Sequence, residues 1–258
     1  MIKAVFFDID GTLITFNTHE MPESTSRALE ALRRKGVRIF IATGRAPQSI
    51  SFMKKYFDFD GVISFNGQYC FDKTGVLHDV PIPAETVLSV LPYLEEKQIA
   101  SSFETVGANY FNLVNDRVRE LIRLVGVDES EPQAVDIAGL NQSVYQMTTF
   151  VTPEEEADLV AHLPGCRAVR WYPTFVNVIG ANSGKHIGIS KVCGKYGISR
   201  DEIMAFGDGG NDVDMLEYAG IGVAMGNGGA DAKAAADYIT DDVEHDGIFN
   251  ALKHFGVI

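Results

Sequence analysis

The sequence predicts an α/β protein with a doubly wound parallel sheet that carries an inserted α+β unit. Short apolar runs alternate with helical patterns toward both ends of the chain, as at IKAVFF, VRIFIA and IMAFG. Such alternation of strands and helices favours a mostly parallel sheet. The middle instead has paired short β-patterned stretches without long crossovers, such as CRAVRWY with FVNVIG, which is typical of antiparallel strands. We therefore expect a core domain of residues 1–81 plus 183–258 and an inserted domain of residues 82–182.

The first part of the core predicts a strand, a loop and a helix. The apolar run IKAVFF is followed by the polar stretch DIDGT. Ala28, Leu29 and Leu32 then recur at helical spacing, and Gly36 stands where a glycine commonly ends a helix. This order predicts the first strand–helix unit of the sheet.

The remaining elements of the core repeat this pattern. VRIFIA predicts a second strand, and Ile50, Met53 and Phe57 indicate a helix after it by their spacings of three and four. GVISF predicts a third strand, and alternating apolar residues on both sides of Lys73-Thr74-Gly75 indicate a hairpin. Near the other end, IMAFG and IGVAM predict two more strands, each followed by a helical stretch.

Composition and charge limit the classes of partner. The chain has 258 residues, with 22 basic and 35 acidic side chains and a net charge of −13. A field of that sign repels nucleic acid phosphates and anionic membranes. Three cysteines without a CxxC pair suit a reducing cytosol, and no apolar run approaches the ~18 to 20 residues of a membrane span. We expect a cytoplasmic protein that binds neither nucleic acid nor membranes; its oligomeric state is left open.

Ligands of doubly wound sheets bind at the carboxyl ends of the strands, so the residues that follow each predicted strand are the candidates for a site. In chain order these are Asp8, Asp10, Gly11 and Thr12, then Thr43, Gly44 and Arg45, then Asn66 and Gly67, and finally Asp208, Asn211 and Asp212. Four carboxylates at one edge repel each other unless a cation lies between them. Hard oxygen ligands with room for water favour Mg²⁺.

Four segments resemble the motifs of the haloacid dehalogenase superfamily, in their order and strand context. They are FFDIDGTL (6–13), IATGR (41–45), Lys185 and FGDGGNDVDML (206–216). The insert lies between the threonine and lysine motifs, and this position and its α+β character resemble the C2-type cap of the Cof-like, subfamily IIB sugar phosphatases. The resemblance implies a Rossmann-like catalytic core covered by a cap domain.

The resemblance also implies a chemistry, namely Mg²⁺-dependent hydrolysis of small cytosolic phosphate esters, above all sugar phosphates, through an aspartyl-phosphate. Asp8 would be the nucleophile, and Asp10 would act first as general acid and then as general base. Asp8, the backbone carbonyl of Asp10 and Asp208 would hold Mg²⁺.

The substrate-binding residues implied by the resemblance are Thr43, Gly44, Arg45, Lys185 and Asn211. Asp212 would support them, either by orienting Lys185 or by contacting the metal. The family usually has glycine directly after the motif lysine, whereas this chain has His186. Lys191 therefore stays open as the alternative motif lysine.

Two other functions and one structural question also stay open. A phosphotransferase or phosphomutase would use the same aspartyl-phosphate while excluding water. A signalling receiver would be phosphorylated on an aspartate as a switch, although a general acid such as Asp10 argues against it, because a switch benefits from slow hydrolysis. In the insert, Trp171 and Tyr172 would either stack on a sugar ring or pack in a sheet core.

Overall fold

The computed structural model describes residues 1–124 and 132–258, and within them the chain divides into two compact units. The core unit holds Met1–Gly44, Ser51–Asp79 and Gly184–Ile258, and the insert unit holds Arg45–Ile50 and Val80–Ser183. Each unit has its own sheet and its own buried apolar clusters. The roles of the two units as catalytic core and cap stay predictions.

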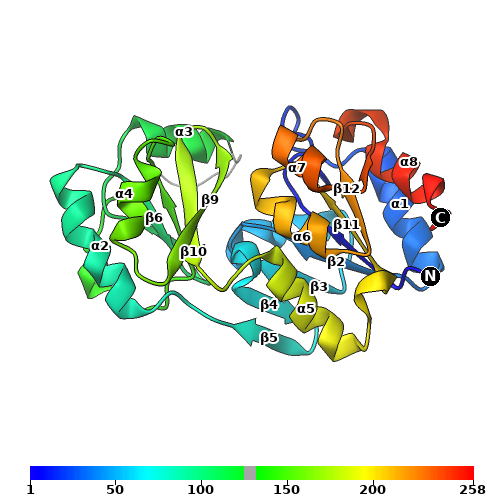
Figure 1. Ribbon diagram of the computed structural model, residues 1–258, viewed down its shortest axis with the longest axis horizontal. Coiled ribbons are helices and arrows are strands. Elements are labelled where there is room, and N and C mark those ends of the chain that lie inside the picture. The colour runs from blue at the N-terminus through cyan, green and yellow to red at the C-terminus, as the bar shows by residue number, and fades with distance from the viewer. Residues whose placement is uncertain (125–131) are drawn as a thin grey trace. The chain divides into compact units, whose positions relative to one another are not determined.

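The core unit is built on an eight-stranded sheet in the order β13-β12-β11-β1-β2-β3-β4-β5 (Figure 1). The neighbours from β13 to β3 are parallel, and β4 and β5 are added as an antiparallel hairpin. This arrangement confirms the predicted α/β class and its mostly parallel sheet. The strands are β1 (Ala4–Phe7), β2 (Arg38–Ala42), β3 (Gly61–Ser64), β4 (Tyr69–Asp72), β5 (Gly75–Asp79), β11 (Ile203–Gly207), β12 (Ile221–Ala224) and β13 (Tyr238–Ile239).

Helices complete the core unit. The sheet face that carries Phe6 and Phe40 packs against three of them, through residues such as Val192, Met215 and Ala232. The helix predicted around Leu29 forms and contacts the last helix of the chain, beside which it lies in Figure 1. The α-helices are α1 (Glu23–Arg34), α5 (Lys185–Tyr196), α6 (Val213–Tyr218), α7 (Ala230–Ala235) and α8 (Gly247–His254).

One predicted helix has a different geometry. The segment after β2 forms a 3₁₀ helix over Pro47–Lys55. In a 3₁₀ helix residues three apart share a face, so the spacing of Ile50 and Met53 suits this geometry as well as an α-helix, and both side chains are buried. No helix of the described residues is both long enough and apolar enough to span a bilayer.

The insert unit is a five-stranded sheet in the order β7-β6-β8-β10-β9, and its paired strands are antiparallel, as the sequence predicts. One face of this sheet, with Phe103, Met147 and Val178, packs on Leu94 and Leu159 of two helices. The elements are α2 (Ala84–Glu96), β6 (Ser101–Glu104), β7 (Asn109–Phe111), α3 (Asp116–Leu124), β8 (Gln146–Thr149), α4 (Glu156–Ala161), β9 (Cys166–Tyr172) and β10 (Phe175–Gly180).

A buried carboxyl group, Glu104 at the end of β6, makes the insert unit sensitive to pH. It is 7% exposed and accepts hydrogen bonds from the Thr148 hydroxyl at 2.5 Å and the Gln146 amide at 3.0 Å. Burial raises the pKa of Glu104 to about 7, and the two hydrogen bonds only partly oppose this shift. The folded insert therefore holds the Glu104 proton more tightly than the unfolded chain does.

We expect the free energy of unfolding of the insert to fall by up to about 3 kcal/mol as the pH rises from about 4.5 to about 7. The sign follows because the folded state binds more protons over this range. Glu104→Gln should remove this pH dependence. The free energy of unfolding of the variant minus that of the wild type should therefore increase from pH 5 to pH 8. Urea unfolding followed by the fluorescence of Trp171, the only tryptophan of the chain, measures this in the insert. Glu96→Gln changes an exposed glutamate of α2 and is the control. A Glu104→Gln variant whose free energy of unfolding depended on pH as in the wild type would contradict the prediction.

Candidate functional site

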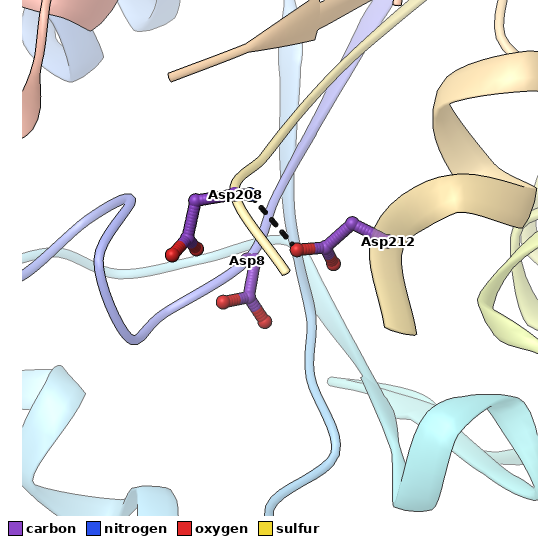
Figure 2. A group of neighbouring side chains, drawn as sticks. All are labelled: Asp8, Asp208 and Asp212. Carbon is purple, nitrogen blue, oxygen red and sulfur yellow. Dashed lines mark hydrogen bonds between the residues drawn. The ribbon is translucent and has the colours of Figure 1, made fainter. Parts of the chain in front are cut away.

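Three carboxylates meet at the carboxyl ends of β1 and β11 (Figure 2). These strands are parallel neighbours, with Phe7 opposite Phe206, so the residues that follow them are brought together. Asp8 directly follows β1, Asp208 directly follows β11, and Asp212 closes the 3₁₀ turn Gly210–Asp212 before α6. One oxygen from each of the three lies within 4.8 Å of the others, and the exposed fractions are 6%, 9% and 0% in that order.

Lys185 supplies the positive charge of this cluster. It is the first residue of α5 and is fully buried. Its Nζ donates to Oδ1 of Asp8 at 2.6 Å and to Oδ1 of Asp212 at 2.5 Å. Burial by itself lowers the pKa of Lys185, but the charges of Asp212 and Asp8 outweigh it and raise the pKa above its ordinary value. Lys191, the alternative that the sequence left open, is exposed on α5.

Asp212 is held by the backbone as well as by Lys185. Its Oδ2 accepts the N–H groups of Asp208 at 2.9 Å and of Gly209 at 2.8 Å, while its Oδ1 faces the ammonium group. Both oxygens are thus engaged by protein donors. This arrangement favours the orientation of Lys185 over direct contact with a metal.

Ionisation of Asp8 and Asp208 is unfavourable in the absence of a cation. Burial raises the pKa of Asp8 to about 7; Lys185 opposes this, whereas Asp212 and Asp10 add to it. Burial, together with the charges of Asp212 and Asp8, raises the pKa of Asp208 to about 9. A divalent cation between these oxygens would favour the ionised form of both groups. The donor set, made of hard carboxylate oxygens, therefore fits a cation such as Mg²⁺.

The backbone of the turn after Asp8 lies close to the side chain of Asp208. Gly11 has a φ of +77°, and a Cβ added there would lie 2.4 Å from Oδ2 of Asp208. The Thr12 hydroxyl donates to the other oxygen of Asp208 at 3.2 Å. Asp10 is partly exposed, and its carboxylate is not one of the three that cluster. Its predicted metal contact, through the backbone carbonyl, stays a prediction.

The other predicted substrate-binding residues lie after β2 and in the Gly210–Asp212 turn. Thr43 is buried; its N–H donates to the Ile63 carbonyl at 2.8 Å, and its carbonyl accepts the N–H of Asn66 at 3.0 Å. The Asn211 amide donates to Oδ1 of Asn66 at 3.1 Å. Gly44 ends the segment of the core unit that contains Thr43, and Arg45 begins the insert unit, where its guanidinium donates to the Ser49 carbonyl at 3.5 Å.

Two residues enter the site without an assigned role in the sequence analysis. Thr12 lies inside the first motif, and its position after the first predicted strand is the sequence feature that indicates a place in the site. Asn66 follows the third predicted strand, but the sequence gives no sign that its side chain reaches Asn211, 145 positions away.

The structure supports the core alternative for one aromatic residue of the insert. Tyr172 is partly buried and stacks on Phe175, with ring centroids 5.2 Å apart, against a buried cluster that contains Phe175, Phe111 and Phe150. Tyr172 therefore packs within the insert. The side chain of Trp171 lies outside the described residues.

Comparisons with known proteins agree on one family. The family model of the haloacid dehalogenase-like hydrolases matches residues 5–252. YkrA of Bacillus subtilis, which carries a phosphatase name, is 32% identical over 99% of this chain and 98% of its own length. The 5-amino-6-(5-phospho-D-ribitylamino)uracil phosphatase YitU of the same organism is 27% identical over 97% of this chain and 96% of its own. The solved structure of a subclass IIB sugar phosphatase is 42% identical, with a TM-score of 0.91, and the match covers 99% of this chain and 100% of that one.

Proposed function

The chain belongs to the haloacid dehalogenase-like hydrolase family, and from this premise we propose that it is a Mg²⁺-dependent phosphatase that cleaves sugar phosphates through an aspartyl-phosphate. The observation that carries the proposal is the buried array in which Lys185 joins Asp8 to Asp212 beside Asp208. A structural ion pair would not need the third carboxylate. A nucleophile that receives a phosphoryl anion needs both a cation site and a fixed ammonium group beside it.

Asp8, Asp208 and the backbone carbonyl of Asp10 are the residues that would hold the metal. Bound Mg²⁺ would offset the charge of the phosphoryl oxygens, so that an anionic ester can approach a carboxylate. Lys185 adds a second positive charge that belongs to the protein itself. In a chain with a net charge of −13, this local positive charge favours the binding of an anionic substrate.

The first half-reaction transfers the phosphoryl group to Asp8. A carboxylate oxygen of Asp8 forms a bond to phosphorus as the bond from phosphorus to the ester oxygen breaks. Asp10, in its protonated form, donates its proton to that departing oxygen, and the alcohol leaves. Lys185, Thr43 and Asn211 would hold the phosphoryl oxygens during the transfer.

The second half-reaction returns the enzyme to its starting state. Asp10 is now a carboxylate and accepts a proton from water as the water oxygen attacks phosphorus. The bond from phosphorus to Asp8 breaks, inorganic phosphate forms, and Asp10 is again protonated. One residue serves both steps because the first step leaves it in the form that the second requires.

The choice of sugar phosphates is supported by the relatives. One similar solved structure is that of a sugar phosphatase, and the substrate in the name of YitU carries its phosphate on a ribityl chain. Both descriptions place the phosphate on a polyhydroxylated carbon chain. In this mechanism the core residues would act on the phosphoryl group and the ester oxygen, which all phosphate esters share, so the choice among alcohols would come from elsewhere in the chain. Cytoplasmic location and the lack of nucleic acid binding stay predictions from charge and cysteine content.

A panel of phosphate esters tests the proposal. We expect inorganic phosphate to be released from hexose and pentose phosphates in the presence of Mg²⁺, with kcat/KM values that differ among them by roughly 10- to 200-fold, the size of single-contact effects. A phosphoserine peptide and a nucleoside monophosphate are the comparison substrates. If either exceeded every sugar phosphate by about a hundredfold, the substrate class would be wrong. Transfer of the phosphoryl group to an added alcohol without release of phosphate would support the phosphotransferase alternative.

A further inference from the structure

A turn with unusual backbone geometry follows β3. Phe65, Asn66 and Gly67 have consecutive positive φ values of 50°, 51° and 100°. Left-handed conformations are costly for residues with a Cβ, and two such residues in succession persist only where the surroundings hold them. The three residues are buried, so no solvent contact compensates the strain. Strained backbone of this kind clusters at active sites and ligand-binding sites.

This turn contacts the segments that carry three predicted substrate-binding residues. The N–H of Asn66 donates to the Thr43 carbonyl at 3.0 Å, and its Oδ1 accepts the Asn211 amide at 3.1 Å. The third segment is the start of α5, where Lys185 begins the helix. A Cβ added to Gly67 would lie 2.0 Å from the carbonyl oxygen of Gly184 and 3.3 Å from the N atom of Lys185.

The close packing against α5 fixes the turn in place. Gly188 lies one helical turn after Gly184, and a Cβ added there would lie 2.5 Å from Cγ2 of Ile63 and 3.2 Å from Cα of Gly67. The turn therefore has no room to shift toward the helix. Because its backbone is held, the Asn66 side chain offers Asn211 an acceptor at a fixed position.

We infer that Asn66 is a positioning residue of the phosphoryl site, which orients the Asn211 side chain through the bond between Oδ1 and Nδ2. The inference rests on the proposed function, because it assigns the purpose of that orientation to the binding of a phosphoryl oxygen. An amide has two distinct ends, so a fixed acceptor for its nitrogen also determines where its oxygen and its second N–H point. Asn suits the position because it combines tolerance of left-handed backbone with a side-chain acceptor.

A double-mutant cycle with Asn66→Gly and Asn211→Ala tests the inference. Glycine adopts the backbone of Asn66 without strain, so only the side chain is removed. We expect each single variant to lower kcat/KM for p-nitrophenyl phosphate by roughly 10- to 100-fold, the loss of one well-placed hydrogen bond. The double variant should lose no more than Asn211→Ala alone, because Asn66 acts through Asn211. The affinity for inorganic phosphate in the presence of Mg²⁺, measured by calorimetry, should show the same non-additivity.

The controls separate positioning from stability. Gln98→Gly replaces another polar residue with positive φ, in the insert unit, and should leave kcat/KM within twofold of wild type. The melting temperature of Asn66→Gly should stay within roughly 3 °C of wild type. Losses that multiply in the double variant, or an Asn66→Gly enzyme with wild-type kcat/KM, would overturn the inference and leave the proposed function standing. A wild-type protein without phosphatase activity or phosphate binding would overturn both.

Discussion

Asp8→Asn is expected to lower kcat by about 10⁴- to 10⁶-fold, the usual effect of removing a nucleophile. The amide keeps the shape of the side chain but cannot form the bond to phosphorus. The fold should be maintained, because the side-chain oxygen of asparagine can still accept a hydrogen bond from Lys185, and Lys185 keeps its ion pair with Asp212. Steady-state phosphate release measures the rate, and circular dichroism with thermal unfolding checks the fold.

Two further measurements complete the test of Asp8. Asp201→Asn changes an exposed aspartate of the same unit and should keep wild-type kcat. Intact-mass spectrometry of acid-quenched wild-type enzyme during turnover should show the mass of one added phosphoryl group, and the Asp8→Asn variant should not. A correctly folded Asp8→Asn enzyme with a tenth of wild-type activity would exclude Asp8 as the nucleophile.

Removal of the metal is expected to lower activity by at least about 10³-fold, equivalent to several kcal/mol of lost charge stabilisation. Without a cation, no metal charge offsets the carboxyl groups of Asp8 and Asp208 next to the incoming anion. Burial and neighbouring carboxylates raise the pKa values of both groups, so additional negative charge at this position is unfavourable. EDTA should therefore abolish phosphate release, and Mg²⁺ should restore it. Ca²⁺ should inhibit, because its larger and less regular shell of ligands displaces the nucleophile from phosphorus.

The stability of the folded protein gives an independent measure of metal binding. Mg²⁺ that binds only the folded state should raise the melting temperature of the wild type as its concentration rises. Asp208→Asn should lose this stabilisation, since it removes a carboxylate while keeping an acceptor for Thr12. Full activity in chelator would remove the metal from the mechanism. Equal stabilisation of the Asp208→Asn variant would exclude Asp208 as a ligand.

The fold class and the main carboxylates followed from local patterns. Alternating strands and helices predicted a mostly parallel sheet, and residues after the ends of strands must gather at one edge of such a sheet. Asp8 and Asp208 could therefore be chosen as partners although 200 positions separate them. Gly36 likewise ends α1 with a positive φ, because that signal is local to the helix.

The pairing of individual side chains was decided only by the tertiary structure. Lys185 and Lys191 both belong to α5. Only the packing of that helix on the sheet makes Lys185 buried and leaves Lys191 exposed. The hydrogen bond from Lys185 to Asp212 forms because the turn after β11 ends beside the start of α5. These contacts depend on the order of the strands and on the closeness of helix packing. Neither quantity has a local sequence signal, because hydrophobic periodicity shows which face of an element is buried and not which neighbour covers it.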